Sequence, residues 1–164
     1  MSLLSCSDNA EIDVRNIEKN KGPDEIINSF EMILHSGEKT EWLMKADVMK
    51  RFNAEKYWWA YIVELETMSD EEKNFYKSDS IHVSDLTDVL TGWGNVEITS
   101  PNGYLSTDKI IWNKRTDKIY APNEIYLKKD ANEITGSDLH TNMSFDFIDL
   151  ENVKGQGSIE QEQK

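Results

Sequence analysis

The chain is poor in several residue types, and each scarcity narrows the class of protein it can be. Its 164 residues include one cysteine, Cys6, so no internal disulfide can form. Lys and Arg number 18 against 31 Asp and Glu, and a net charge of −13 argues against a nucleic-acid partner, because phosphate contacts depend on basic side chains. No run of about 18 apolar residues is present, so nothing in the sequence as written spans a bilayer as a helix.

Motifs of common catalytic and metal sites are also missing. The three histidines, His35, His82 and His140, lie 47 and 58 residues apart, which matches no metal-ligand spacing. No nucleophile elbow, phosphate-binding glycine loop or zinc-protease motif occurs. We therefore expect a protein that is not an enzyme and that uses no metal or cofactor. One catalytic alternative stays open, because a glycosidase needs only two carboxylates across a cleft and the chain is rich in them.

The N-terminal residues predict an anchor. Leu3-Leu4-Ser5-Cys6, followed by polar residues, resembles the cleavage box of a bacterial lipoprotein, in which the cysteine becomes lipidated. A lipid on Cys6 would tether the protein to a membrane surface. The alternative is an incidental cysteine. We expect residues 1–24 to hold this box and a flexible tether, 25–157 to form a single domain, and 158–164 to be a disordered tail.

The most informative pattern that is present is a repeat of about 30 residues. A small residue followed by Asp recurs at Asp47, Asp79, Asp108 and Asp138, with spacings of 32, 29 and 30. Such a period indicates repeated supersecondary units that stack on one another. Asp is unfavourable within strands, so we expect each of these four residues to lie where a strand bends, with its carboxylate accepting backbone N–H bonds.

Between the repeated aspartates the apolar residues alternate with polar ones, which is the period of a β-strand. Turn residues separate the short runs, as in Ser100-Pro101-Asn102-Gly103. We interpret 68–73 as a hairpin loop, while a short helix over 47–57 competes with the strand interpretation. The pattern predicts an all-β fold of stacked antiparallel hairpins that enclose a long apolar groove.

The order of several short motifs resembles that of the LptC-type lipopolysaccharide-export proteins. Asn74-Phe75-Tyr76-Lys77-Ser78-Asp79 runs toward Gly92-Trp93-Gly94-Asn95-Val96-Glu97-Ile98, as a "K-A-D-x-A" strand precedes a "G-x-V-x-V" strand in that family. Leu105-Ser106-Thr107-Asp108-Lys109-Ile110-Ile111-Trp112 resembles its "L-x-T-D-x-L-x-W" strand. The resemblance covers roughly residues 30–157. The family's usual N-terminal membrane helix is missing from this sequence, so anchoring would depend on Cys6.

The resemblance implies that the hairpins form a twisted β-jellyroll, or β-taco, with the apolar groove between its two sheets. It also implies a periplasmic protein anchored at the inner membrane. It would take lipopolysaccharide from an ABC transporter, hold its acyl chains in the groove, and pass it to a periplasmic bridge protein through edge-strand addition. It also implies that Trp59 is a lining residue, and by alternation Tyr61 and Val63 would face the same way. The other residues expected to line this groove are Trp42, Met44, Ile81, Val83, Val96, Ile98, Trp112, Ile125, Leu127, Phe145 and Phe147.

Two alternatives remain at this point. The first is a soluble bridge protein of the same pathway, which shares the repeat and needs no anchor. The second belongs to another class: a jellyroll carbohydrate-active enzyme or glycan-binding module. For any single aromatic residue, packing in the core is the simpler alternative to lining a groove.

Overall fold

The computed structural model describes residues 22–36, 39–69 and 72–154. These residues form ten β-strands and no helix, so the all-β prediction is confirmed. The strands are β1 (Glu25–Ser36), β2 (Lys39–Phe52), β3 (Tyr57–Ser69), β4 (Glu72–Ser84), β5 (Val89–Ser100), β6 (Gly103–Asn113), β7 (Lys118–Ala121), β8 (Ile125–Lys129), β9 (Asn132–Thr141) and β10 (Ile148–Lys154). The predictions for Cys6, the tether and the tail fall on residues 1–21 and 155–164, outside the described part.

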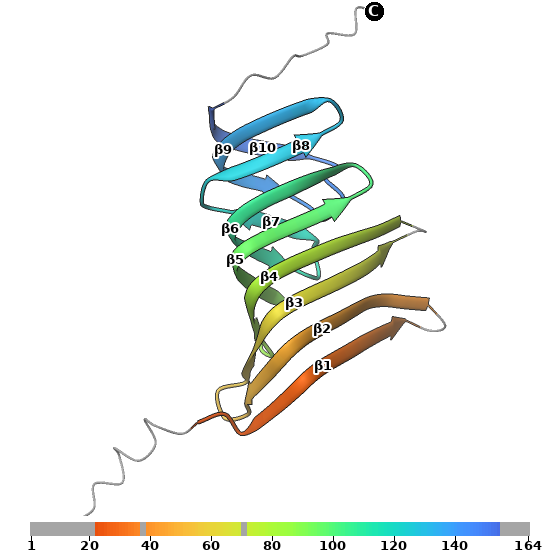
Figure 1. Cartoon of the computed structure of the whole chain (residues 1–164), viewed down its shortest axis with the longest axis vertical. Coiled ribbons are helices and arrows are strands. Elements are labelled where there is room, and N and C mark those ends of the chain that lie inside the picture. Colours follow the sequence, from red (N-terminus) through yellow and green to blue (C-terminus); the bar gives the residue numbers. More distant parts are fainter. Residues whose placement is uncertain (1–21, 37–38, 70–71, 155–164) are drawn as a thin grey trace, which may run out of the picture.

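All ten strands belong to one antiparallel sheet in which neighbours in sequence are mostly neighbours in space. The hairpins stack from β1 to β10 along the long axis of the molecule (Figure 1). Strands β7 and β8 share one position, because both pair with β6 on one side and β9 on the other. They are separated by 122–124, where Pro122 lacks an N–H that a continuous strand would need.

The predicted hairpin at 68–73 is confirmed, since Met68 pairs with Lys73 and Ser69 with Glu72. The helix that competed over 47–57 does not form. Strand β2 continues to Phe52, and a turn at 53–56 leads directly into β3. Tertiary pairing on both sides of β2 therefore overrides the local helical spacing.

Each long strand changes its buried face partway along, and the four repeated aspartates mark these changes. Buried positions have one parity before each Asp and the other after it, as Ala46 and Met49 show around Asp47. The same switch occurs at Asp79, Asp108 and Asp138, and the β4–β5 register shifts between Lys77 and Ser80. The prediction that these residues lie at bends is confirmed. The hydrogen bonds recorded for Asp79 and Asp138 come from side chains, not from the backbone N–H groups that we expected.

Between these aspartates, neighbouring strands bend at residues with positive φ. Ser29 on β1, Ile62 on β3 and Asn95 on β5 have φ values of 53°, 53° and 45°, and Gly94 has 73°. Together with the aspartates they form one row across the sheet, which we call the corner row. It folds the single sheet into two facing halves, so the described chain is consistent with a jellyroll or taco-like fold.

We name the two halves by their outer faces. The aromatic half contains residues 25–28, 48–61, 80–93, 109–121, 139–141 and 148–150. The charged half contains residues 30–36, 39–46, 63–69, 72–78, 96–107 and 125–136. Apolar side chains from the inner faces of both halves form the core. Its largest fully buried members are Tyr76, Phe145, Ile81, Leu90, Ile98, Leu105, Ile110, Ile119, Leu127, Leu139, Val63 and Val96.

The segment 142–147 connects β9 to β10 and bridges the two halves. Phe145 is fully buried, and its carbonyl accepts a hydrogen bond from Lys129 Nζ at 2.6 Å. Asn102 Nδ2 donates to the carbonyl of Ser144 at 3.0 Å. These contacts hold the segment between the halves, where it fills the space toward the β10 end of the stack. Open space remains toward β1.

Candidate functional site

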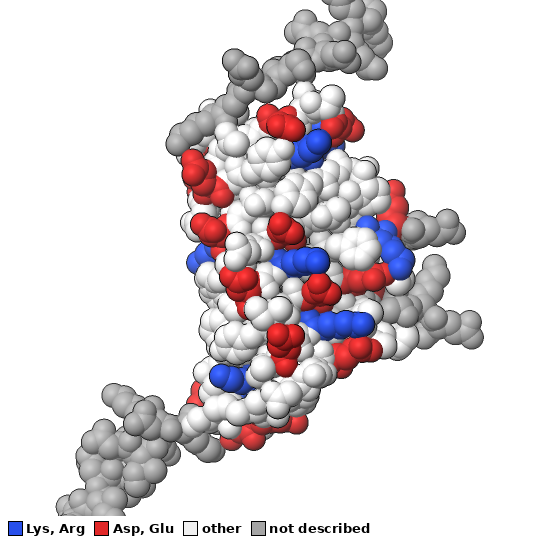
Figure 2. All heavy atoms as spheres, in the orientation of Figure 1, with Lys and Arg blue, Asp and Glu red and all other residues white. Residues whose placement is uncertain are grey.

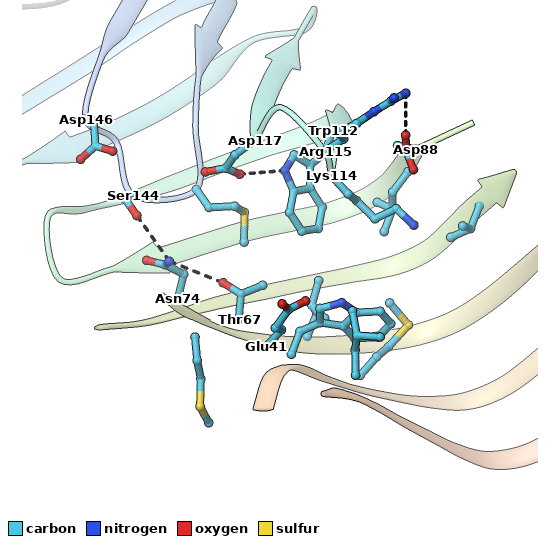
Figure 3. A pocket seen from close by; sticks show the side chains of 18 of the residues that line it. Glu41, Thr67, Asn74, Asp88, Trp112, Lys114, Arg115, Asp117, Ser144 and Asp146 are labelled. Atoms are coloured by element: carbon cyan, nitrogen blue, oxygen red, sulfur yellow. Dashed lines mark hydrogen bonds and ion pairs between the residues drawn. The ribbon is translucent and has the colours of Figure 1, made fainter. Parts of the chain in front are cut away.

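An open cleft of about 540 Å³ lies between the two halves at the edge away from the corner row (Figure 3). Residues close to the hairpin ends of both halves surround it, together with the 142–147 segment. Its lining residues are Leu34, Glu41, Trp42, Met44, Trp58, Leu65, Thr67, Met68, Asn74, Val83, Asp88, Leu90, Trp112, Lys114, Arg115, Asp117, Met143, Ser144 and Asp146.

The walls of the cleft are apolar. Met44 and Leu65 come from the charged half, while Trp58, Leu90 and Trp112 come from the aromatic half. All five are less than one tenth exposed, because each points inward from its strand. Such a surface takes up hydrocarbon in preference to water.

The rim is polar and mixed in charge. Trp112 Nε1 donates to Asp117 Oδ1 at 2.9 Å, and Arg115 Nη2 pairs with Asp88 Oδ2 at 2.7 Å; Figure 3 shows both contacts. Burial raises the pKa of Asp117, and the hydrogen bond from Trp112 partly opposes that rise. The charge of Asp146, which also lines the cleft, raises the same pKa further.

Asn74 is the buried polar residue of the cleft wall. Its Nδ2 lies 3.5 Å from both Thr67 Oγ1 and Ser144 Oγ, and it thereby links β3, β4 and the bridging segment. Within the described residues, its Oδ1 has no hydrogen-bond partner. The amide therefore keeps hydrogen-bonding capacity in an otherwise apolar wall.

The structure sorts the predicted groove residues other than Trp59 and Tyr61 into three groups. Trp42, Met44, Val83 and Trp112 line the cleft. Phe147 is 44% exposed and lies outside the lining set. Seven others are buried at 3% exposure or less and pack in the core between the halves, away from the cleft: Val63, Ile81, Val96, Ile98, Ile125, Leu127 and Phe145.

The prediction that Trp59 and Tyr61 line the groove is wrong. Trp58 and Ala60 are the buried residues at the start of β3, so Trp59 and Tyr61 point to the outer face. Ile62, with φ of 53°, then switches the parity. Val63 points inward as expected, and so does Leu65. A simple alternation through Ile62 placed Trp59 and Tyr61 on the same side as Val63, because an isoleucine carries no sequence signal for a left-handed bend.

Sequence reasoning also missed Trp58, Leu90, Met143 and Asn74 as lining residues. Trp58 was excluded by the same parity error. Leu90 had a usable signal, since it alternates with Gly92 ahead of Val96 and Ile98 on the inner face of β5. Met143 and Asn74 depend on the path of the bridging segment, for which no local pattern exists.

Other kinds of site find little support in the part of the chain that the structure describes. There, no three His, Cys, Asp or Glu side chains gather as a metal site would require. No helix of that part is long and apolar enough to cross a membrane. Four carboxylates line the cleft: Glu41, Asp88, Asp117 and Asp146. Asp88 pairs with Arg115, and Asp117 and Asp146 accept hydrogen bonds from Trp112 and Asn142 respectively.

The fold and the cleft together define a class: an all-β protein whose single antiparallel sheet folds over on itself and leaves an apolar cleft at its open edge. Comparison with known proteins places the chain no further. No protein-family model matches it, and no curated protein sequence matches it.

Proposed function

We propose that this protein is a non-catalytic lipid-transfer component of lipopolysaccharide export. In this role it takes the lipid from an inner-membrane ABC transporter and passes it to a periplasmic bridge protein. The observation that carries the proposal is the cleft between the halves, whose walls are mainly Trp, Met and aliphatic side chains and whose rim is polar. This arrangement suits an amphiphile with its acyl chains inside and its headgroup in water.

Size and energetics agree with such a cargo. The cleft of about 540 Å³ falls within the roughly 300–1,000 Å³ that is common for ligand pockets. Each methylene group buried in it would contribute about 0.8 kcal/mol. Burial of several methylene groups of an acyl chain would therefore supply useful affinity without any charged contact. That matters because a chain of net charge −13 offers little attraction to a phosphorylated headgroup.

The end of the stack at β1 supports transfer to a neighbour. Strand β1 is 12 residues long and pairs only with β2 among the described strands, so its other edge is available for strand addition. Phe30, Met32 and Trp42 at this end are only partly buried against the core. A partner strand added to β1 would extend the apolar space between the halves. Membrane anchoring through Cys6 belongs to this proposal.

Photo-crosslinking to lipopolysaccharide tests the proposal. A photoreactive amino acid is placed in turn at Trp42, at Met44 and at Lys45, in otherwise wild-type protein that is shown to be folded. Met44 and Lys45 are adjacent on β2 but point to opposite faces, so they form a matched pair. We expect lipid adducts at Trp42 and Met44 and none at Lys45.

Two other outcomes would redirect the proposal. Equal labelling at all three positions would mean nonspecific contact, and no labelling would remove the lipid-carrier role. In the second case the hydrolase alternative would be examined by assaying glycan hydrolysis with wild type and Asp117→Asn. Turnover that this substitution abolishes would favour an enzyme.

A further inference from the structure

The outer face of the aromatic half carries a continuous series of rings that the core does not use. Trp59 and Trp93 stack with ring centroids 5.2 Å apart, and Trp59 lies 6.4 Å from Tyr61. His82 lies 5.0 Å from both Trp59 and Tyr57, and Tyr57 stacks on Phe52 at 4.8 Å. We call these six residues the ring platform: Phe52, Tyr57, Trp59, Tyr61, His82 and Trp93.

The platform crosses four strands, β2 to β5, and its geometry follows from the register. Trp59 on β3 and Trp93 on β5 meet above β4, where the small Ser80 is paired with both Tyr61 and Trp93. All six ring residues are half-buried, so parts of their surfaces remain open to solvent. Hydroxyl groups lie among them, because Ser80 and Thr91 share the same outward positions.

Positive charge, and not negative charge, accompanies the rings. Lys50 Nζ lies 5.1 Å from the Tyr61 ring centroid, and Lys109 Nζ lies 5.8 Å from that of Trp93. The outward strand positions of this face from β2 to β6 hold no Asp or Glu, although the chain contains 31 acidic residues. Acidic side chains border the platform at its two ends: Asp47, Asp79 and Asp108 lie at the corner row, and Asp85, paired with Arg51, lies in the loop after β4.

The outer face of the charged half has the opposite character. There Lys45 pairs with Glu31 at 3.6 Å and Lys77 with Glu64 at 2.9 Å, in a ladder of exposed ion pairs. Figure 2 views the molecule from this side, and basic and acidic side chains are interspersed over its surface. The two outer faces are built from the same alternating strands. The lack of Asp and Glu at the outward strand positions of the aromatic half is therefore a specific property of that face.

We propose that the ring platform binds a negatively charged polysaccharide chain. The apolar faces of sugar rings pack on exposed aromatic surface, and their hydroxyl groups reach Ser80, Thr91 and His82, a combination typical of ligand sites. Lys50 and Lys109 stand at two sides of the platform and are placed to meet the acidic groups of the chain. This site is on the opposite face of the sheet from the cleft, so it is separate from the lipid site.

The same observations weigh against a membrane surface as the occupant. The large apolar side chains that protrude most, such as Leu86 and Ile62, lie outside the platform, while its rings are half-buried in a flat sheet. Insertion into a bilayer interface needs side chains that project from the surface. A flat, partly polar face instead suits a ligand laid along it.

The test measures binding of alginate, an acidic polysaccharide without acyl chains, by affinity electrophoresis and tryptophan fluorescence. The full chain is used. We expect retarded migration of wild type and about tenfold weaker binding for Trp59→Ala or Trp93→Ala. Tyr104→Ala is the matched control, since Tyr104 is half-buried and contacts another ring, Tyr126, on the opposite outer face. It should bind as wild type does.

A second variant keeps the rings in place in case a tryptophan substitution impairs folding. Lys50→Gln combined with Lys109→Gln should weaken alginate binding and reduce its dependence on salt. Absence of alginate binding by wild type overturns the proposal. So does equal weakening by Tyr104→Ala, or binding of anionic vesicles or single-stranded DNA as tight as that of alginate. Because alginate carries no lipid, failure here leaves the lipid-carrier proposal intact.

Discussion

The indole N–H of Trp112 donates a 2.9 Å hydrogen bond to the carboxylate of Asp117, and this contact joins β6 to the turn that follows it at the rim of the cleft. Trp112 is 7% exposed, so the N–H has little access to water if its partner is removed. The Asp117 carboxylate also accepts a backbone hydrogen bond from Met143 in the bridging segment. One side chain thus holds a cleft wall and the bridging segment together.

Replacing Asp117 with alanine should lower the free energy of unfolding by about 1–3 kcal/mol, because it leaves a buried donor unpaired. Urea denaturation measures this loss. Asp88→Ala is the rim control. It breaks the ion pair with Arg115, in which the Arg115 side chain is 76% exposed and the Asp88 side chain 45%. Because this pair is exposed, its loss should lower the free energy of unfolding by less than about 1 kcal/mol. Equal losses for the two variants would contradict a special role for Asp117.

Tyr76 and Gly92 hold the two halves at close range. A Cβ atom at position 92 would overlap the Tyr76 hydroxyl, so Gly92→Ala should destabilise the protein by about 1–3 kcal/mol through overpacking. Tyr76 is buried, and burial raises the pKa of its hydroxyl. Within the described residues that hydroxyl makes no hydrogen bond, and the neighbouring Ser78 hydroxyl donates to the Ser80 carbonyl at 3.2 Å instead.

Tyr76→Phe should therefore leave stability unchanged or raise it, since it removes an unpaired polar atom. Combined with Gly92→Ala, it should recover part of the loss, because the overlapping oxygen is gone. A double-mutant cycle by urea denaturation measures this coupling. Strict additivity of the two substitutions would show that the contact does not limit how closely the halves approach.

Ile62 adopts a left-handed backbone conformation that is costly for a β-branched residue. Its φ is 53° and its side chain is 56% exposed, so little burial offsets the strain. Ile62→Gly should raise the free energy of unfolding by about 1 kcal/mol. Ile33→Gly is the matched control, an exposed isoleucine in a strand without positive φ, and it should lower stability by about 0.5–1 kcal/mol. Thermal denaturation showing the same sign for both would refute the strain at Ile62.

Protonation of His82 should destabilise the fold. Burial lowers the pKa of His82 below its usual value, because its ring lies against those of Tyr57 and Trp59. The unfolded chain then binds a proton near pH 6.5 while the folded chain does not. Stability is therefore complete above that pH and decreases as the pH falls below it.

The measurement is the urea midpoint between about pH 8 and pH 5.5 for wild type and His82→Gln. The midpoint of wild type should decline more steeply as the pH falls, because the glutamine variant cannot take up this proton. Parallel curves for the two proteins would contradict the prediction.

Local pattern was sufficient to predict the class of fold and the positions of its bends. Alternating apolar residues identified the strands, and a recurring Asp at spacings of 32, 29 and 30 identified four of the corners. These features are local because side-chain alternation and the low strand propensity of Asp act within a few residues. They survive in any arrangement of the hairpins.

Whether a side chain points into the core or to the outer face depends on contacts between strands that are far apart in the chain. The left-handed bend at Ile62 places Trp58 on the inner face and Trp59 on the outer face. Strand β3 bends there because it is paired on both sides with strands that bend at the same row. Likewise, Val63 and Phe145 are core residues because the halves approach closely near Tyr76 and the bridging segment fills one end. Local sequence pattern is therefore enough to predict strands with corners. The distance between the folded halves, which depends on contacts between residues far apart in the chain, decided where core ends and cleft begins.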